Sequence, residues 1–207
     1  ASGFQSIKAE DSKIVIAGGQ ESMSLAPHAV HLRDGKKLGD TKIIDTMIKD
    51  GLWDAFHGYH MGVTAENVAT KFQVTRDDQD KFALKSQEKA LLAQKNNKFN
   101  EEIINFKIKS KKAETDFNKD EHPRDGIDLE TLARLKPVFK KDGTVTAGNA
   151  SGINDGAAAI TLMSSEEAEK KNLQKLVSIK SWATCGVDPA LMGTGPIPAS
   201  KKALDLA

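Results

Sequence analysis

Apolar and small residues gather in three short runs along this chain, and each run predicts a β-strand. Residues 13–19, KIVIAGG, form a β-branched run that stops at two glycines, as a buried strand ending in a tight loop does. AAAITLMSS, from residue 157, follows a loop of small residues. LVSIKSWATC, from residue 176, is the third run. A shorter strand is predicted within EEIINFKIKS, residues 101–110.

Helix signals stand between these runs. Thr75, followed three positions later by Asp78, resembles a capping box with Asp in place of the usual Glu. The charged, alanine-rich stretch that follows predicts a long surface helix to about Lys95. The residues expected to face inward from it are Phe82, Ala83, Ala90 and Leu91. Ser164 with Glu167 predicts a second capped helix, and a third helix is expected to begin near Ala199.

The stretches between the periodic segments are expected to be irregular. Residues 21–51 contain glycines and scattered basic residues, which predicts a protruding loop with a short helix. Residues 111–126, KKAETDFNKDEHPRDG, are predicted to be exposed and irregular. Because strands alternate with helices, the chain is expected to be an α/β protein. The roughly 130 residues between the first two strand runs exceed an ordinary connection, so they are expected to form a subdomain.

Composition narrows the class of protein. Thirty basic and 29 acidic residues leave a formal charge of +1, so no global charge attracts nucleic acid or an anionic membrane. No apolar run reaches the roughly 20 residues of a membrane span. The single cysteine, Cys185, excludes an intrachain disulfide and favours a reducing, cytoplasmic location. The chain opens with Ala1 rather than Met and closes at Ala207 within a predicted helix, so both natural ends are expected to lie outside it.

The segment NASGINDGAAA, residues 149–159, is the most informative local motif. Its small residues permit a ligand to approach the backbone, and Ser151 offers a hydroxyl. The alternative is a tight turn that packs a strand against a helix. The motif lacks the spacing of a P-loop, which excludes that type of phosphate site.

Each of the other candidate residues also has an explanation that involves no ligand. His60 and Met61 are either a hydrogen-bonding group and an apolar wall of a pocket, or a surface histidine beside a core methionine. His57 and His60 are three residues apart, but no further His or Cys spacing completes a zinc site, and no metal is expected. Arg124 either binds phosphate or is solvated in a charged loop. MGTGPIP either lines a cavity or ends a strand.

Six blocks of this sequence together resemble the thiolase family in order and spacing. They are AGGQESMS (17–24), DAFHGYHMGVTAENVA (54–69), SQEKA (86–90), LKPVF (135–139), GTVTAGNASGINDGAAA (143–159) and GVDPALMGTGPIPAS (186–200). The HMG at residues 60–62 resembles the short-chain biosynthetic members of the family. Gln20 departs from the methionine that the family commonly has there.

The resemblance implies an αβαβα fold and a reaction. The expected reaction is the Claisen condensation of two acetyl-CoA molecules to acetoacetyl-CoA and CoA, together with the reverse thiolysis, with no cofactor besides the thioester substrate. Residues 1–24 and 153–173 would belong to the N-terminal half of the fold, residues 25–152 to the loop domain, and residues 174–207 to the start of the C-terminal half. A homotetramer would form through residues 28–51.

The resemblance also implies a set of CoA-binding residues. Arg124 would meet the 3'-phosphate end, Leu52 and Phe139 the adenine and pantetheine surroundings, Ala147 and Ser151 the pantetheine amides, and His60, Met61 and Met192 the inner pantetheine and acyl pocket. The family's C-x-S-G, NEAF, GHP and CxGGG motifs, which carry its nucleophile, oxyanion hole, activating histidine and base, are not found in these 207 residues. The chain alone is therefore expected to be inactive. The alternatives are a non-catalytic CoA-binding or scaffold protein with this fold and, more remotely, an unrelated nucleotide-binding α/β domain.

Overall fold

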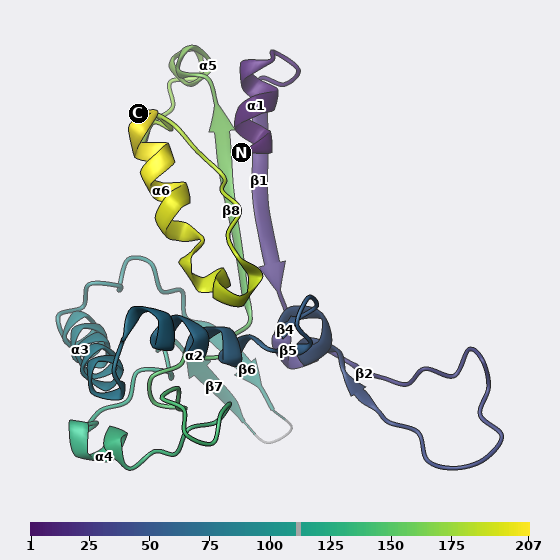
Figure 1. Cartoon of the computed structure of the whole chain (residues 1–207). Helices are drawn as coiled ribbons and strands as arrows, with labels where there is room; N and C mark the ends of the chain where they lie inside the picture. Colours follow the sequence, from purple (N-terminus) through teal and green to yellow (C-terminus); the bar gives the residue numbers. More distant parts are fainter. Residues whose placement is uncertain (111–112) are drawn as a thin grey trace. The chain divides into compact units, whose positions relative to one another are not determined.

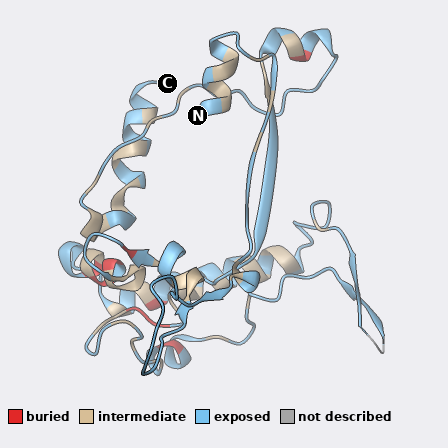
Figure 2. Ribbon diagram, turned by 90° about the vertical axis from the view of Figure 1, so that its right-hand side faces the viewer, coloured by how far each residue is buried: buried red, intermediate tan, exposed pale blue. Residues whose placement is uncertain are grey.

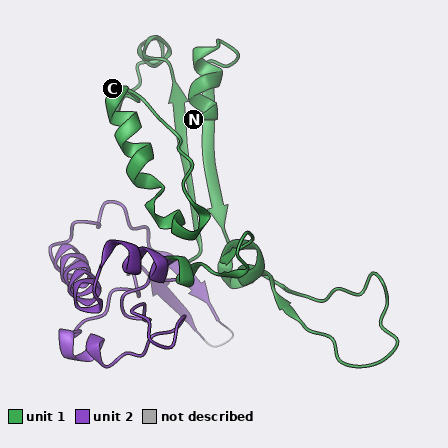
Figure 3. Cartoon of the chain, viewed as in Figure 1, with its two compact units in different colours: residues 1–64, 153–207 green, residues 65–152 purple. Residues whose placement is uncertain are grey.

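The computed structural model describes residues 1–110 and 113–207, which form two compact units. Unit 1 consists of residues 1–64 and 153–207, and unit 2 of residues 65–152 (Figure 3). The four-part domain division drawn from the sequence stays a prediction.

Helices and short strand pairs alternate along the described residues (Figure 1). The α-helices are α1 (Ser2–Lys8), α2 (Met61–Phe72), α3 (Arg76–Lys95), α4 (Leu129–Ala133), α5 (Ser165–Lys170) and α6 (Pro196–Asp205). Shorter helical turns are η1 (Met23–Leu25), the π-helix η2 (Met47–Gly51) and η3 (Pro189–Thr194). The strands are β1 (Ile14–Glu21), β2 (His28–Ala29), β3 (Ile44–Asp45), β4 (Trp53–Asp54), β5 (Tyr59–His60), β6 (Phe106–Lys109), β7 (Glu114–Phe117) and β8 (Gly156–Met163). This mixed content confirms the predicted α/β class. Among the described residues, no helix is both long and apolar enough to traverse a lipid bilayer.

The longest strand pair joins the first two apolar runs of the sequence. β1 and β8 pair antiparallel from Ile14 opposite Met163 to Glu21 opposite Gly156, so both predicted strands are confirmed. The predicted end of the first strand is wrong, because β1 continues through its two glycines to Glu21, and none of its residues is buried. A side chain at Gly18 would overlap the carbonyl oxygen of Ala158 across the pair, which explains the glycine at that position. In unit 1, helix α1 packs on this pair.

The β1–β8 pair exposes much of its apolar surface. Ile16 is 76% exposed and Ile160 is 58% exposed, and Figure 2 shows both strands almost free of buried residues. Two strands alone cannot bury a hydrophobic face, because each face needs another layer packed against it. The other described residues of unit 1 do not supply a full layer over either strand.

The predicted capping signals are confirmed. The Thr75 hydroxyl accepts from the Asp78 amide at 3.1 Å, and the Asp78 carboxylate accepts from the Thr75 amide, which completes the capping box at the start of α3. Ser164 accepts from the Glu167 amide at the start of α5. The last helix, α6, begins with Pro196 rather than near Ala199, because proline is compatible with the first helical turn.

Two further details of the sequence prediction were wrong. Phe82 of α3 is 77% exposed rather than inward, because the inner face of that helix is taken by smaller and polar side chains. The segment expected to be irregular contains β7, which pairs with β6 through Phe106 opposite Phe117 and a 3.3 Å ion pair between Lys107 and Glu114. Lys111 and Lys112 of that segment lie outside the described residues.

The third apolar run does not form a strand. Residues 176–185 have no regular secondary structure, and Leu176 and Val177 are exposed. A strand exists only when its backbone groups pair with a neighbour, and no described residue forms a ladder with this run. Apolar periodicity therefore identified a segment suited to a sheet without identifying its partner.

Unit 2 is organised around a core that is as polar as it is apolar. Its buried apolar residues are Ala69, Leu132 and Val145, and its buried polar residues are Glu66, Asp80 and Thr146. Buried polar groups persist in a folded protein only when hydrogen bonds replace their lost hydration. The connections of these groups therefore determine how this unit is held together.

Candidate functional site

Three of the predicted site residues lie together in unit 1. Leu52 follows η2, His60 ends β5, and Met61 begins α2. The Met61 amide donates to the Leu52 carbonyl at 2.8 Å, and His60 pairs with Trp53 in the β4–β5 ladder. All three residues are half-buried. The short β4–β5 hairpin thus places Leu52 beside His60 and Met61.

The hydrogen bonds of His60 determine its tautomer. The Gly62 amide donates to Nδ1 of His60 at 3.0 Å. A nitrogen that accepts a hydrogen bond carries no proton, so the neutral ring holds its proton on Nε2. His60 therefore presents an N–H donor on the side of the ring opposite the backbone contact.

The turn before His60 is fixed by a buried carboxylate. Asp54 accepts from the Phe56 amide at 2.9 Å and from Nδ1 of His57 at 2.7 Å. Burial alone would raise the pKa of Asp54, but the hydrogen bonds from Phe56 and His57 outweigh it and lower that pKa below its ordinary value. His57 also stacks on Tyr59. His57 is thus engaged by the turn and does not share a helical face with His60.

Met192 lies on another segment of unit 1. It belongs to η3, whose first turn is capped by the Asp188 carboxylate accepting from the Ala190 amide at 2.9 Å. Its side chain is 47% exposed. The rigid-loop prediction for MGTGPIP thus corresponds to a short helical turn that leads directly into α6.

A second cluster of predicted site residues lies on the loop at residues 143–151 of unit 2, which we call the small-residue loop. Ala147 and Ser151 are both exposed on it. One buried side chain, Glu66 of α2, holds the start of the loop. Its carboxylate accepts from the Thr144 amide at 2.8 Å, from the Thr144 hydroxyl at 2.9 Å and from the Val145 amide at 2.8 Å. Glu66 thus fixes two consecutive peptide units of the loop.

Asn149 holds the other end of the same loop. Its Oδ1 accepts from the Thr146 amide at 2.8 Å, while its Nδ2 donates to the Thr144 carbonyl at 3.0 Å and to Oδ1 of Asp80 at 2.9 Å. The second oxygen of Asp80 accepts from Nε of Arg76 at 2.7 Å. Asp80 is 4% exposed, so its charge is compensated by direct partners instead of water.

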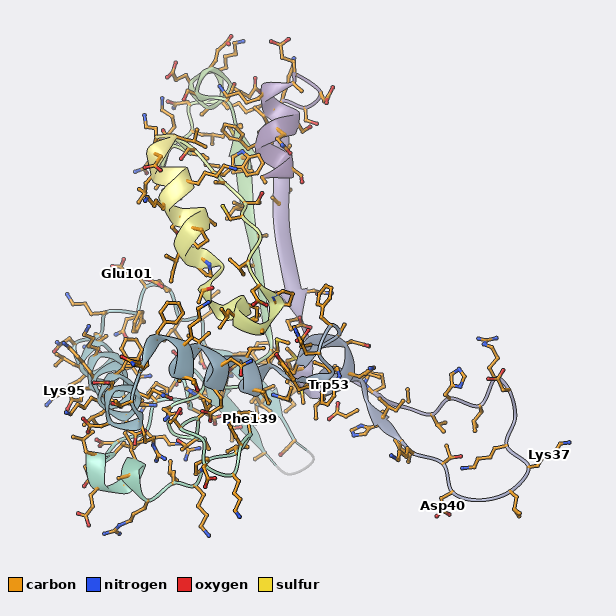
Figure 4. The ribbon with its side chains drawn as sticks, viewed as in Figure 1. Lys37, Asp40, Trp53, Lys95, Glu101 and Phe139 are labelled. Atoms are coloured by element: carbon orange, nitrogen blue, oxygen red, sulfur yellow. The ribbon has the colours of Figure 1, made fainter. Side chains whose placement is uncertain are left out.

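The chain before the loop packs alongside it. The Val138 amide donates to the Val145 carbonyl at 3.0 Å, which draws the neighbouring Phe139 to the small-residue loop. Figure 4 marks Phe139 among the side chains of unit 2. Arg76 also donates to the carbonyl oxygens of Leu132 and Leu135, so the end of α4 joins the same network. Phe139, Ala147 and Ser151 therefore belong to one continuous, hydrogen-bonded structure.

Arg124 lies in a separate exposed segment of unit 2. Its backbone amide donates to Oε1 of Gln87 on α3 at 3.0 Å. This bond fixes the backbone at Arg124 while its exposed guanidinium extends from the loop. The exposure is compatible with either reading of Arg124 from the sequence.

The blocks AGGQESMS and GTVTAGNASGINDGAAA also meet in unit 1. The amide of Ser24 donates to Oδ1 of Asp155 at 2.9 Å, and the Ser24 hydroxyl donates to the other oxygen of the same carboxylate. Hydrogen bonds from the Ser24 hydroxyl and amide lower the pKa of Asp155. This contact ties the chain after β1 to the chain before β8.

Sequence reasoning missed the residues that hold the small-residue loop and the Arg124 segment in place. These are Glu66, Asp80, Gln87 and Asn149. Three of them stand inside blocks that were singled out for their resemblance, namely Glu66, Gln87 and Asn149. The signal was therefore present, but the partner of each residue lies too far away in the sequence to be recognised.

Comparisons with known proteins bear on the family and the fold. The family described as thiolase, N-terminal domain, matches residues 1–166. An acetyl-CoA acetyltransferase of Rhizobium meliloti is 59% identical over 207 residues, which are 100% of this chain and 53% of that protein. The crystal structure of a Bacillus anthracis acetyl-CoA acetyltransferase has a TM-score of 0.91 and 45% identity, covering 99% of this chain and 52% of that one. That of human mitochondrial 3-ketoacyl-CoA thiolase has a TM-score of 0.91, 43% identity and the same coverage.

The chain thus spans about half the length of these proteins, and its structure is a partial thiolase fold. A family match over most of the chain, together with more than 40% identity to structures of the same fold, leaves one assignment. The chain belongs to the thiolase family.

Proposed function

We propose that the full-length protein is an acetyl-CoA acetyltransferase, which condenses two acetyl-CoA molecules to acetoacetyl-CoA and CoA and also runs the reverse thiolysis. In this proposal the present chain supplies CoA-binding residues. The observation that carries it is the small-residue loop, whose buried side is fixed by Glu66 and Asn149 while Ala147 and Ser151 remain exposed. An extended ligand can come close to the small exposed residues of such a loop, while the hydrogen bonds on the buried side keep the loop's conformation fixed.

Each predicted residue has a chemical part in binding. The exposed Arg124 guanidinium would form charge-assisted hydrogen bonds to the 3'-phosphate of CoA. Ala147 and the Ser151 hydroxyl would meet the pantetheine amides, and Leu52 and Phe139 would meet the adenine and pantetheine surroundings. The Nε2–H group of His60 is a donor suited to a carbonyl oxygen of the pantetheine or thioester.

The remaining parts of the proposal concern the acyl group and assembly. Met61 and Met192 offer polarizable, adaptable walls for a small acyl group. The loop between β2 and β3 has its tip near Lys37 and Asp40 (Figure 4), and we propose residues 28–51 as the tetramer contact. A cytoplasmic location stays a prediction.

The reaction itself provides the first test. We expect the purified full-length protein to cleave acetoacetyl-CoA in the presence of CoA, measured by the loss of acetoacetyl-CoA absorbance. A polypeptide of these 207 residues alone is expected to show no turnover above the uncatalysed rate, since it contains none of the family's four catalytic motifs. Turnover by the isolated polypeptide would contradict this division of roles. CoA binding by the full-length protein without turnover would instead favour a non-catalytic role.

Replacing Arg124 with alanine tests the phosphate contact. In the full-length protein, we expect Arg124→Ala to raise KM for acetoacetyl-CoA roughly tenfold while kcat changes less than about twofold. The reason is that a contact remote from the reacting atoms contributes equally to substrate and transition-state binding. Arg134→Ala is the matched control, because the Arg134 side chain of unit 2 is exposed and pairs with the equally exposed Glu130. A fall in kcat at constant KM would contradict the assignment.

A further inference from the structure

Helix α3 carries two polar side chains seven residues apart that bond to separate irregular segments of unit 2. Asp80 and Gln87 lie on one face, since seven residues of an α-helix fall only about 20° short of two full turns. Asp80 is buried and Gln87 half-buried. Gln94, a further seven residues along, makes a longer contact of 3.5 Å with the carbonyl of Asp120. We call Asp80 and Gln87 the α3 polar pair.

The first member of the pair acts on the small-residue loop. Asp80 accepts from Nδ2 of Asn149, two residues before Ser151, and its other oxygen is held by Arg76. The amide group of Asn149 is thereby oriented, so that its oxygen accepts from Thr146. An amide flipped by 180° would put its nitrogen against the Thr146 amide and its oxygen against the Asp80 carboxylate. Asp80, together with the Thr144 carbonyl, thus determines which way Asn149 points and, through it, the path of the chain into Ser151.

The second member acts on the segment that carries Arg124. Gln87 accepts from the Arg124 amide at 3.0 Å across 37 residues of sequence. The helix that presents Gln87 is anchored at its start by the capping box of Thr75 and Asp78. A rigid helix therefore fixes both attachment points relative to one another within unit 2, since a helix of this length does not bend freely.

We propose that the α3 polar pair positions two different parts of the CoA site: Asp80, through Asn149, positions the pantetheine-binding residues Ala147 and Ser151, and Gln87 positions the phosphate-binding Arg124. This inference rests on the proposed function. The pair touches no substrate, so its members are positioning residues. A substrate that lacks the phosphorylated nucleotide should therefore depend on the role of Asp80 but not on the role of Gln87.

Two substrates distinguish the role of Asp80 from the role of Gln87 in the full-length protein. Acetoacetyl-CoA contains both portions, whereas the thioester of acetoacetate with pantetheine lacks the phosphorylated nucleotide. Asn149→Ala removes three hydrogen bonds, from the Thr146 amide, to the Thr144 carbonyl and to Asp80. We expect it to raise KM for both substrates by the same factor, roughly five- to tenfold. Gln87→Ala is expected to raise KM for acetoacetyl-CoA roughly threefold and to leave KM for the pantetheine thioester unchanged. In both variants kcat per folded molecule is expected to remain within about twofold of its original value.

The controls separate positioning from loss of folded protein. Asn100→Ala, at an exposed turn of unit 2, should leave both KM values unchanged. A merely structural role would lower kcat by reducing the folded fraction and would not move KM. If Asn149→Ala is insoluble, Asn149→Ser, which keeps a short acceptor for the Thr146 amide, must show the same equal rise.

The outcomes also separate this inference from the proposed function. A full-length protein that turns over neither substrate rejects the proposed function itself. An active protein in which Asn149→Ala leaves both KM values unchanged, or in which Gln87→Ala raises both equally, overturns the positioning roles alone.

Discussion

Replacing Glu66 with glutamine is expected to lower the free energy of unfolding of residues 65–152 by roughly 2–3 kcal/mol. The carboxylate accepts hydrogen bonds from the Thr144 amide and hydroxyl and from the Val145 amide, and it is 3% exposed. Glutamine offers one acceptor oxygen and one amino group. In the orientation that keeps both amides bonded, its amino group faces the Thr144 hydroxyl, which already accepts from Nε2 of Gln79, so the hydroxyl proton loses its acceptor. The hydrogen bonds that remain also lose the negative charge that strengthened them.

Amide hydrogen exchange of the full-length protein measures this loss where it occurs. In Glu66→Gln, the Thr144 and Val145 amides are expected to exchange roughly 30-fold faster or more, since each 1.4 kcal/mol corresponds to a factor of about ten. Glu88→Gln is the matched control, because Glu88 is exposed on α3 and the same change there should leave these two amides protected. Unchanged exchange in Glu66→Gln would mean that the carboxylate does not hold the loop.

The success of the sequence reading depended on how local each signal was. The capping box at Thr75 and the cap at Ser164 connect residues three apart, and both were predicted correctly. The β1 and β8 strands were recognised from their apolar runs, although nothing in either run revealed that they pair with each other. The run at residues 176–185 has the same pattern but no ladder among the described residues. Apolar pattern thus reports suitability for a sheet, whereas a strand also requires a partner.

The residues that hold the candidate site in place could not be predicted from the sequence, because their partners are also distant along the chain. Glu66 and Thr144 are 78 residues apart, and Asp80 and Asn149 are 69 apart. An isolated glutamate or aspartate on a helix is ordinarily solvated, so its sequence gives no reason to expect burial. The exposed candidates Arg124 and Ser151 were proposed by resemblance, which identifies contacts with a ligand more readily than it identifies what holds those contacts in place.

Replacing Gly148 with alanine is expected to disturb the same loop by crowding. A β-carbon at this position would lie 2.6 Å from Cδ2 of Leu132 and 2.6 Å from Cδ1 of Leu135, much closer than carbon atoms pack. Leu132 is 2% exposed, so neighbouring atoms enclose its side chain. Either the two leucine side chains or the loop must therefore shift, and we expect the loop to move at Ala147 on one side and Asn149 on the other. We expect a loss of roughly 1–3 kcal/mol in unfolding free energy and a rise in KM for acetoacetyl-CoA of roughly tenfold.

A double-mutant cycle with Leu135→Ala tests whether crowding is the cause. Leu135→Ala removes one of the two clashing methyl groups, so it should relieve part of the cost of Gly148→Ala, and the double variant should be more stable than the sum of the single changes predicts. Gly186→Ala is the matched control, because a β-carbon there meets no atom within 4 Å and should alter neither stability nor KM by a comparable amount. Strict additivity in the cycle would show that crowding against Leu135 does not cause the loss of stability.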